Sequence, residues 1–235
     1  MKKTTVKTLL LTGLLSVGFN LLPSAAPASA ACTGLHQALA AKAPDAPGSD
    51  TTAPDSRVEK AVKWALAIAA DPVHGYSQGA ENATESHPYT GSREGVDYDC
   101  SSLVYHAFQQ GGFPIIEAWH KNPEYMRLYQ GKQYSGDADT IWTDLQVVGG
   151  FSKYSWEDVK DRLMRGDILC DPERHVAIYV GEGKTVEARG VNNPRGGDWR
   201  TGDQGGEIDI YEAQGRSWKE VYRYTGKSKS TWNAR

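Results

Sequence analysis

The chain is poor in cysteine, with only three among 235 residues, and this limits how it could bind a metal. None of the three lies in a C-x-x-C pair, so the spacing does not favour a closed structural zinc site. A zinc site built from Cys100, Cys170 and His175 is the competing metal hypothesis, but the ligand count argues against it. We therefore expect neither a metal nor an organic cofactor.

An odd cysteine count leaves at least one thiol unpaired. The simplest arrangement is a disulfide between Cys32 and Cys170 that leaves Cys100 free, although connectivity cannot be read from sequence. Lipid attachment at Cys32 is an alternative. The preceding residues SAA lack the large aliphatic residue that lipoprotein signals usually carry at this point.

The sequence also lacks a surplus of positive charge. Lysine and arginine total 26 against 29 acidic residues, which gives a net charge of -3. A nucleic-acid-binding domain usually presents a basic face, so the composition argues against a nucleic-acid partner. No internal repeat is visible in the sequence.

No apolar run is long enough to span a membrane. The run TLLLTGLLSVGFNLL follows the lysine-rich start MKKTTVK and precedes the small residues APASA. A membrane-spanning helix needs about 20 apolar residues, and this run is shorter. The pattern predicts a secretory signal cleaved after Ala30, and hence a secreted protein with no stable membrane insertion after cleavage.

Composition divides the rest of the chain into three parts. Residues 31–56 are rich in Ala, Pro, Asp and Thr and predict a linker, whereas residues 57–226 have the patterning of one compact domain. Residues 227–235 are a polar tail. The predicted secretory signal, residues 1–30, precedes these three parts.

Apolar spacing predicts three helices in the first part of the domain. DSRVEKAVKWALAIAADP begins with the capping residue Asp55 and stops at Pro72, and SSLVYHAFQQGG ends in two glycines. SWEDVKDRLMRGD predicts a helix capped by Ser155, with Val159, Leu163 and Met164 facing inward.

The residues after Gly166 have the pattern expected of β-strands. DILC, HVAIYV, KTVEA, EIDIY and KEVYRY are short β-rich runs separated by Gly, Pro and Asp, and GEGK predicts a hairpin turn. Helices followed by antiparallel strands indicate an α+β domain.

Cys100 lies at or beside the start of the second predicted helix. A thiol there meets the positive end of the helix dipole, which lowers its pKa and favours nucleophilic attack. The alternative is a buried structural thiol, since free cysteines are among the most buried side chains.

A cysteine nucleophile needs a base and a group to orient that base. His175 opens the run HVAIYV after a loop, which suits a base at the rim of a sheet. Glu187 lies 12 positions later, on the returning strand of the same predicted hairpin, where its carboxylate could hold the imidazole. By spacing alone, an ordinary solvated carboxylate is the simpler interpretation of Glu187.

These motifs resemble the NlpC/P60 cysteine peptidases, in particular their phage-lysin-like peptidoglycan amidohydrolases. The resemblance rests on AVKWALAIAADPVHGY, DYDCSSLVYHAF, RGDIL, HVAIYVGEGKTVEA, TGDQGGEIDI and WKEVYRY, which occur in the order typical of the family. It implies a papain-like fold and hydrolysis of amide bonds in peptidoglycan stem peptides. Peptidoglycan would be the partner, and the secreted protein would be associated with the cell wall.

Carried over by position, the resemblance makes Cys100 the nucleophile, His175 the base and Glu187 the orienting group. Many family members place a histidine at the third position, so Glu187 departs from the common pattern. Tyr98, Asp99 and Ser101 are expected to help form the substrate site.

Several functions fit this resemblance. An endopeptidase that cuts within the stem peptide is favoured, and an N-acetylmuramoyl-L-alanine amidase on the same fold is the alternative. A wall-binding protein with a lapsed active site and an acyltransferase are further possibilities. Specificity is expected to lie in the loops over residues 73–97 and 190–206.

Overall fold

The computed structural model describes residues 54–80, 83, 85, 91–123, 135–189, 200–203 and 205–226. The predicted signal peptide, Cys32, almost all of the predicted linker and the polar tail lie outside these residues, so those assignments stay predictions. Within the described residues, no helix is both long and apolar enough to cross a membrane.

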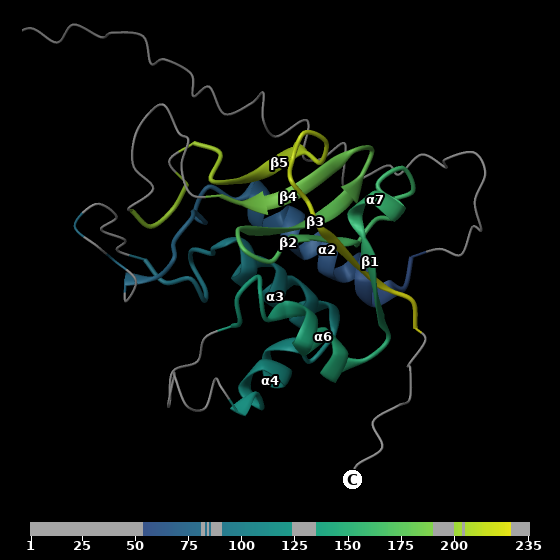
Figure 1. Cartoon of the computed structure of the whole chain (residues 1–235). Helices are drawn as coiled ribbons and strands as arrows, with labels where there is room; N and C mark the ends of the chain where they lie inside the picture. The colour runs from purple at the N-terminus through teal and green to yellow at the C-terminus, as the bar shows by residue number, and fades with distance from the viewer. Residues whose placement is uncertain are drawn as a thin grey trace, which may run out of the picture.

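One sheet of six antiparallel strands forms the centre of the domain (Figure 1). Its spatial order is β1-β6-β2-β3-β4-β5. The strands are β1 (Phe151–Ser155), β2 (Ile168–Asp171), β3 (His175–Gly181), β4 (Lys184–Ala188), β5 (Ile208–Glu212) and β6 (Glu220–Tyr224). The five β-rich runs are confirmed as strands, and β1 is an additional strand that its mixed sequence FSKYS did not reveal.

Helices cover one face of this sheet. They are α2 (Ser56–Ala70), α3 (Cys100–Gly111), α4 (Ile115–His120) and α6 (Ile141–Val148), and the single turn α7 (Trp156–Val159) lies near β1. The helices α2 and α3 pack against each other, α3 over β3 and β4 and α2 over β4 and β5 (Figure 1). The predicted α+β class is confirmed.

The two long helices begin and end where the sequence predicts. The Asp55 carboxylate accepts a hydrogen bond from the Arg57 N–H at 2.8 Å and so caps α2, which ends before Pro72. Gly112 ends α3 with a left-handed φ of 96°, a conformation that glycine adopts without steric cost.

The sheet separates two apolar clusters. Val176 and Ile178 of β3 point toward the helices and join the main core, whereas Ala177 points to the opposite face. The smaller cluster on that face contains Trp156, Val159, Leu169, Ala177, Ala213, Trp218 and Val221. Each large apolar side chain buried in this way contributes roughly 1.5–3 kcal/mol to stability, so both faces of β3 are held in place.

The helix predicted over SWEDVKDRLMRGD is wrong beyond its first turn. The helix α7 contains only Trp156–Val159, and the Ser155 side chain makes no capping hydrogen bond. Further along, the Asp167 carboxylate accepts a hydrogen bond from the Met164 N–H at 2.8 Å, and Gly166 has a φ of 90°. These features turn the chain, and Met164, which was expected to face inward, is 45% exposed.

The predicted hairpin turn between β3 and β4 is confirmed. Glu182 and Gly183 have φ values of 52° and 72°, the positive values that a tight two-residue turn requires. Ile178 pairs with Val186 in the ladder that follows. This register decides which side chains of the two strands share a face.

Candidate active site

Cys100 is the first residue of α3 and is half-buried. The Asp99 carboxylate accepts a hydrogen bond from the Ser102 N–H at 2.7 Å, and the Ser102 hydroxyl accepts one from the Asp99 N–H at 2.9 Å. This reciprocal cap fixes the backbone on both sides of the cysteine. The thiol faces the backbone N–H of Val176, which directly follows His175. The candidate nucleophile therefore lies at the start of β3.

The thiol differs from the sequence-based expectation in its acidity. Burial is the largest influence and raises the pKa of Cys100 to about 12, and the charge of Asp99 acts in the same direction. The Val176 N–H and the Arg93 charge oppose the rise without overcoming it. A thiol with this pKa is protonated at neutral pH, so it would act as a nucleophile only with a base to take its proton.

A buried arginine anchors the segment around Cys100. Arg93 is 6% exposed, and its Nε lies 2.8 Å from Asp99 Oδ2. The same guanidinium donates to Ser101 Oγ at 2.8 Å, to the Gly136 carbonyl at 3.0 Å and to Asp137 Oδ1 at 3.0 Å. A buried charge is costly unless it is paired and hydrogen-bonded. Arg93 therefore ties the helix cap to the chain around residue 136.

The three residues expected to bind substrate, Tyr98, Asp99 and Ser101, are buried. The Tyr98 ring packs edge-on against Trp64, with centroids 5.6 Å apart. Ser101 donates a hydrogen bond to Asp99 at 2.9 Å, and both side chains contact Arg93. Asp99 and Ser101 thus serve the helix cap and its anchor, and a contact with substrate stays a prediction for all three.

His175 and Glu187 meet across the β3–β4 hairpin. Because Ile178 pairs with Val186, the two residues are diagonal neighbours on the same face of the sheet. His175 Nε2 lies 2.8 Å from Glu187 Oε2. An ionised carboxylate only accepts hydrogen bonds, so Nε2 carries the proton and donates, and Nδ1 keeps the lone pair of a base.

Glu187 is fully buried among donors. The Thr185 hydroxyl donates to Oε1 at 2.5 Å, while Arg216 Nη2 and Arg189 Nε lie 3.3 and 3.8 Å from Oε2. Burial alone would raise the pKa of Glu187, but the hydrogen bonds from His175 and Thr185 and the charge of Arg216 outweigh it, and the pKa is lowered. The carboxylate is therefore ionised at neutral pH and can accept the hydrogen bond from His175 Nε2.

Trp218 covers the imidazole on the face of the sheet away from the helices. Its ring stacks on His175 with centroids 5.8 Å apart and an interplanar angle of 23°. The indole N–H donates to the Ala213 carbonyl at 2.9 Å, which fixes the ring. A buried aromatic ring keeps water from the His175–Glu187 bond, and this strengthens the electrostatic interaction.

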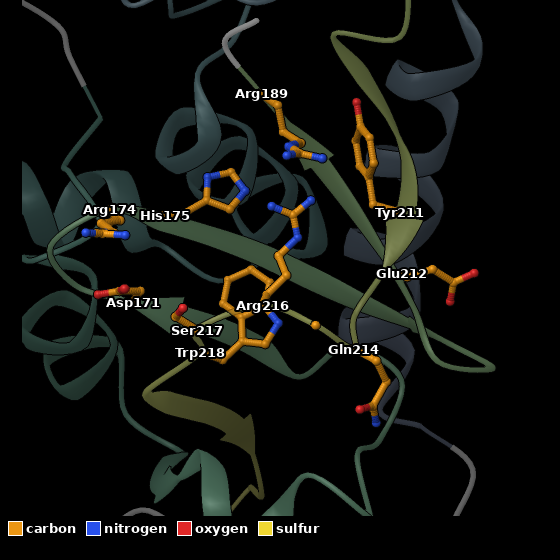
Figure 2. A pocket seen from close by; sticks show the side chains of 11 residues that line it. Asp171, Arg174, His175, Arg189, Tyr211, Glu212, Gln214, Arg216, Ser217 and Trp218 are labelled. Atoms are coloured by element: carbon orange, nitrogen blue, oxygen red, sulfur yellow. The ribbon is translucent and has the colours of Figure 1, made fainter. Parts of the chain in front are cut away.

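An open pocket of about 670 Å³ borders His175 (Figure 2). Trp218 and Tyr211 contribute aromatic surface, and Arg189 and Arg216 contribute the charged head groups that also approach Glu187. The pocket therefore adjoins the candidate base on the side of its carboxylate partner.

Cys170 is fully buried in β2, and its thiol donates to the Ala138 carbonyl at 3.4 Å. It is a free thiol here, and Cys32 lies outside the described residues, so the Cys32–Cys170 disulfide stays a prediction. Across the part of the chain that the structure describes, no three His, Cys, Asp or Glu side chains are placed to hold a metal ion.

Sequence reasoning missed the residues that support the site, namely Arg93, Thr185, Arg189, Arg216 and Trp218. Thr185 could have been found, because it lies two positions before Glu187 and must share its face of the strand. Arg189 lies two positions after Glu187, so the same alternation could have indicated it. Arg93 lies on the loop before α3, and Arg216 and Trp218 lie on the β5–β6 loop, so only the fold brings these three residues to the site.

A sequence model of the NlpC/P60 family matches residues 83–224, which is more than half of the chain and includes Cys100, His175 and Glu187. The chain belongs to the NlpC/P60 family. Members of this family are cell-wall peptidases, so the protein is in general terms a peptidoglycan hydrolase. The family and the papain-like α+β fold implied by the sequence are confirmed.

Two solved structures are also similar to the chain. The hypothetical invasion protein Rv1477 of Mycobacterium tuberculosis is 21% identical over 77% of this chain and 71% of its own, with a TM-score of 0.36. A mutant of the resuscitation promoting factor interacting protein RipA is 20% identical over 85% of each chain, with a TM-score of 0.36. No curated protein sequence matches the chain.

Proposed function

We propose that this NlpC/P60 domain is exported and cuts amide bonds of peptidoglycan stem peptides through a thioester on Cys100. One observation carries the proposal. The 2.8 Å bond from His175 Nε2 to Glu187 leaves Nδ1 as a base, and the next residue along β3 directs its N–H at the Cys100 thiol. The positions of Cys100, His175 and Glu187 near the start of β3 support the roles of nucleophile, base and orienting group for them.

The chemistry uses these groups in turn. His175 Nδ1 takes the thiol proton, and the Cys100 sulfur bonds to the amide carbonyl carbon to give a tetrahedral oxyanion. When the oxyanion collapses, the C–N bond breaks and His175 passes its proton to the departing amine. A water molecule that gives its proton to His175 then attacks the thioester carbon. The C–S bond breaks, and the sulfur regains its proton.

One backbone feature and one side chain support the charged steps. The first turn of α3 directs N–H groups toward the position of Cys100, and such donors stabilise an oxyanion by a factor on the order of 10²–10³ in rate each. Ionised Glu187 stabilises the imidazolium that forms during attack, because its carboxylate accepts the hydrogen bond from Nε2.

We favour an endopeptidase that cuts within the stem peptide. The alternative is an amidase that cuts the sugar–peptide junction. Residues 31–235 should be incubated with a defined disaccharide peptide and with the same peptide lacking the sugar, and the products identified by mass spectrometry. An endopeptidase releases shortened peptides from both substrates. An amidase releases the whole stem peptide from the first and leaves the second intact.

The remaining outcomes separate the other hypotheses. Peptide joined to an added amine would indicate an acyltransferase. Retention on sedimented peptidoglycan with no product from any substrate would indicate a lapsed wall-binding protein, and would refute the hydrolase.

A further inference from the structure

The pocket beside His175 carries more positive charge than its carboxylates balance. Two of the lining residues are acidic, but both pair with lysines. Asp171 Oδ1 lies 3.1 Å from Lys219 Nζ, and Glu212 pairs with Lys184. Neither carboxylate neutralises the arginines that line the same pocket.

Three arginines, Arg174, Arg189 and Arg216, line the pocket. Among the described residues, Glu187 is the one carboxylate within ion-pair distance of Arg189 and Arg216, and Arg174 has no ion pair. Within the described part of the chain, Arg189 and Arg216 therefore share one anion, which already accepts a hydrogen bond from His175. Arg174 adds a third positive charge to the pocket. The surplus charge favours an anionic ligand.

The guanidinium groups of Arg189 and Arg216 are held in place. Both lie against the Tyr211 ring, with their Cζ atoms 4.4 and 5.7 Å from its centroid. In Figure 2 the two side chains reach into the same part of the pocket, whereas Arg174 lies on the other side of His175, beside Asp171. A preorganised guanidinium loses less entropy on binding than a mobile one.

Donor groups remain for a ligand. Arg189 and Arg216 have side chains that are 31% and 24% exposed, and both approach the same oxygen of Glu187. Each guanidinium has five N–H donors in a planar fork that fits a carboxylate in a bidentate manner. One carboxylate oxygen cannot occupy all of these donors, so a second carboxylate can be bound from the pocket.

The position of the pocket indicates which part of a substrate it would meet. Cys100 packs with the core on the helical face, whereas Trp218 and the pocket lie on the opposite face, and His175 borders the pocket. The acyl half of a substrate becomes attached to Cys100. The leaving half receives its proton from Nδ1 of His175 and so lies beside this residue, from which it can reach the pocket that His175 borders.

We propose that Arg189 and Arg216 form a subsite for a free carboxylate on the leaving half of the substrate. The subsite rests on the proposed amide hydrolysis for its substrate, and it predicts a preference for leaving groups that carry an ionised acid. The alternative is that both arginines only balance the charge of Glu187.

The test compares wild type with Arg189→Gln on two matched peptides, which carry either a carboxylate or a carboxamide on the leaving residue. Wild type prefers the carboxylate by about 10-fold to 100-fold in kcat/KM, mainly through KM. The variant loses this preference, because its kcat/KM falls much more on the carboxylate peptide than on the carboxamide peptide. The control variant Arg174→Gln, which removes one charge from the same pocket, keeps the preference. When the acyl halves of both peptides are amidated, the carboxylate preference of wild type and its loss in Arg189→Gln stay the same.

An equal loss of kcat/KM on both peptides in Arg189→Gln, with an altered pH profile of kcat, would overturn the subsite. The two arginines would then only balance the charge of Glu187. If wild type releases no product, the proposed hydrolysis fails, and calorimetric titration of the acidic and amidated leaving-half peptides still decides the subsite. The acidic peptide binds wild type about 10-fold or more tighter than it binds Arg189→Gln. Indistinguishable affinities of wild type for the two peptides would refute the subsite by itself.

Discussion

At the scale of single residues, the account depends on a buried carboxylate that stays ionised. Glu187 has no exposed surface, yet donors from His175, Thr185 and Arg216 surround it and its pKa is lowered. A neutral histidine at this position could orient the imidazole but could not balance its positive charge. Glu187 therefore suits a reaction in which the thiol is protonated at rest and His175 becomes charged during attack.

Replacing Glu187 tests this electrostatic role. Glu187→Gln keeps the size of the side chain but removes the charge, so we expect turnover to remain measurable and to fall on the order of 10²-fold. Initial rates of peptide release at neutral pH measure the effect. The same substitution at Glu212, on the rim of the same pocket, is the control and leaves the rate unchanged. Wild-type rates for Glu187→Gln would show that another group orients His175.

The lowered pKa of Glu187 also makes a prediction about stability. A carboxyl group whose pKa is lower in the folded than in the unfolded state stabilises the fold at pH values above its pKa in the unfolded state, here 4.5. This stabilisation is lost as the pH falls through the pKa of the folded state. Urea unfolding of wild type and Glu187→Gln measures this contribution. The difference between their free energies of unfolding should therefore decrease as the pH falls below 4.5.

The sequence revealed some residues of the site and not others. Cys100 and His175 could be chosen because the start of a helix and the start of a strand are visible in local patterns. Arg93 could not, since its partners at Asp99 and Gly136 come together only in the folded chain. The raised pKa of Cys100 was missed for the same reason, because the extent of burial is a property of the assembled core.

At the scale of elements, the site depends on two local structures. The capping box sets Cys100 at the start of α3, and the β3–β4 turn sets the register that brings His175 to Glu187. Both could be predicted, since capping residues and tight turns have strong local signals. The α7 region could not, because its apolar spacing fits a helix while hydrogen bonds to Asp167 hold a turn.

Gly166 lies where this turn meets α2. A Cβ atom there would lie 2.0 Å from Val58 Cγ1, and the φ of 90° is strained for any other residue. We expect Gly166→Ala to lower the free energy of unfolding by about 2–5 kcal/mol, from backbone strain and overpacking together. Urea denaturation at neutral pH measures the loss.

Gly183 provides the matched control. Its φ of 72° is also left-handed, but a Cβ atom there has no neighbour within 4 Å. Gly183→Ala should lose only the part due to backbone strain, about 1–2 kcal/mol. Equal losses at the two positions would show that contact between Gly166 and α2 does not constrain the packing.

At the scale of the whole molecule, the order of elements indicated the fold class and the family motifs indicated the architecture. The order of the strands in space could not be derived, since β6 lies between β1 and β2 although it is the last strand in the chain. Such long-range pairing is decided by which apolar faces must be covered, and not by local propensity.

The central claim is that Cys100 performs the reaction of this NlpC/P60 domain. The most direct measurement is the release of soluble peptide from purified peptidoglycan by wild type, Cys100→Ala and Cys170→Ala, each confirmed as folded by circular dichroism. The account predicts release by wild type and by Cys170→Ala, and only background release by Cys100→Ala. The same fragments released by folded Cys100→Ala at the wild-type rate would contradict it.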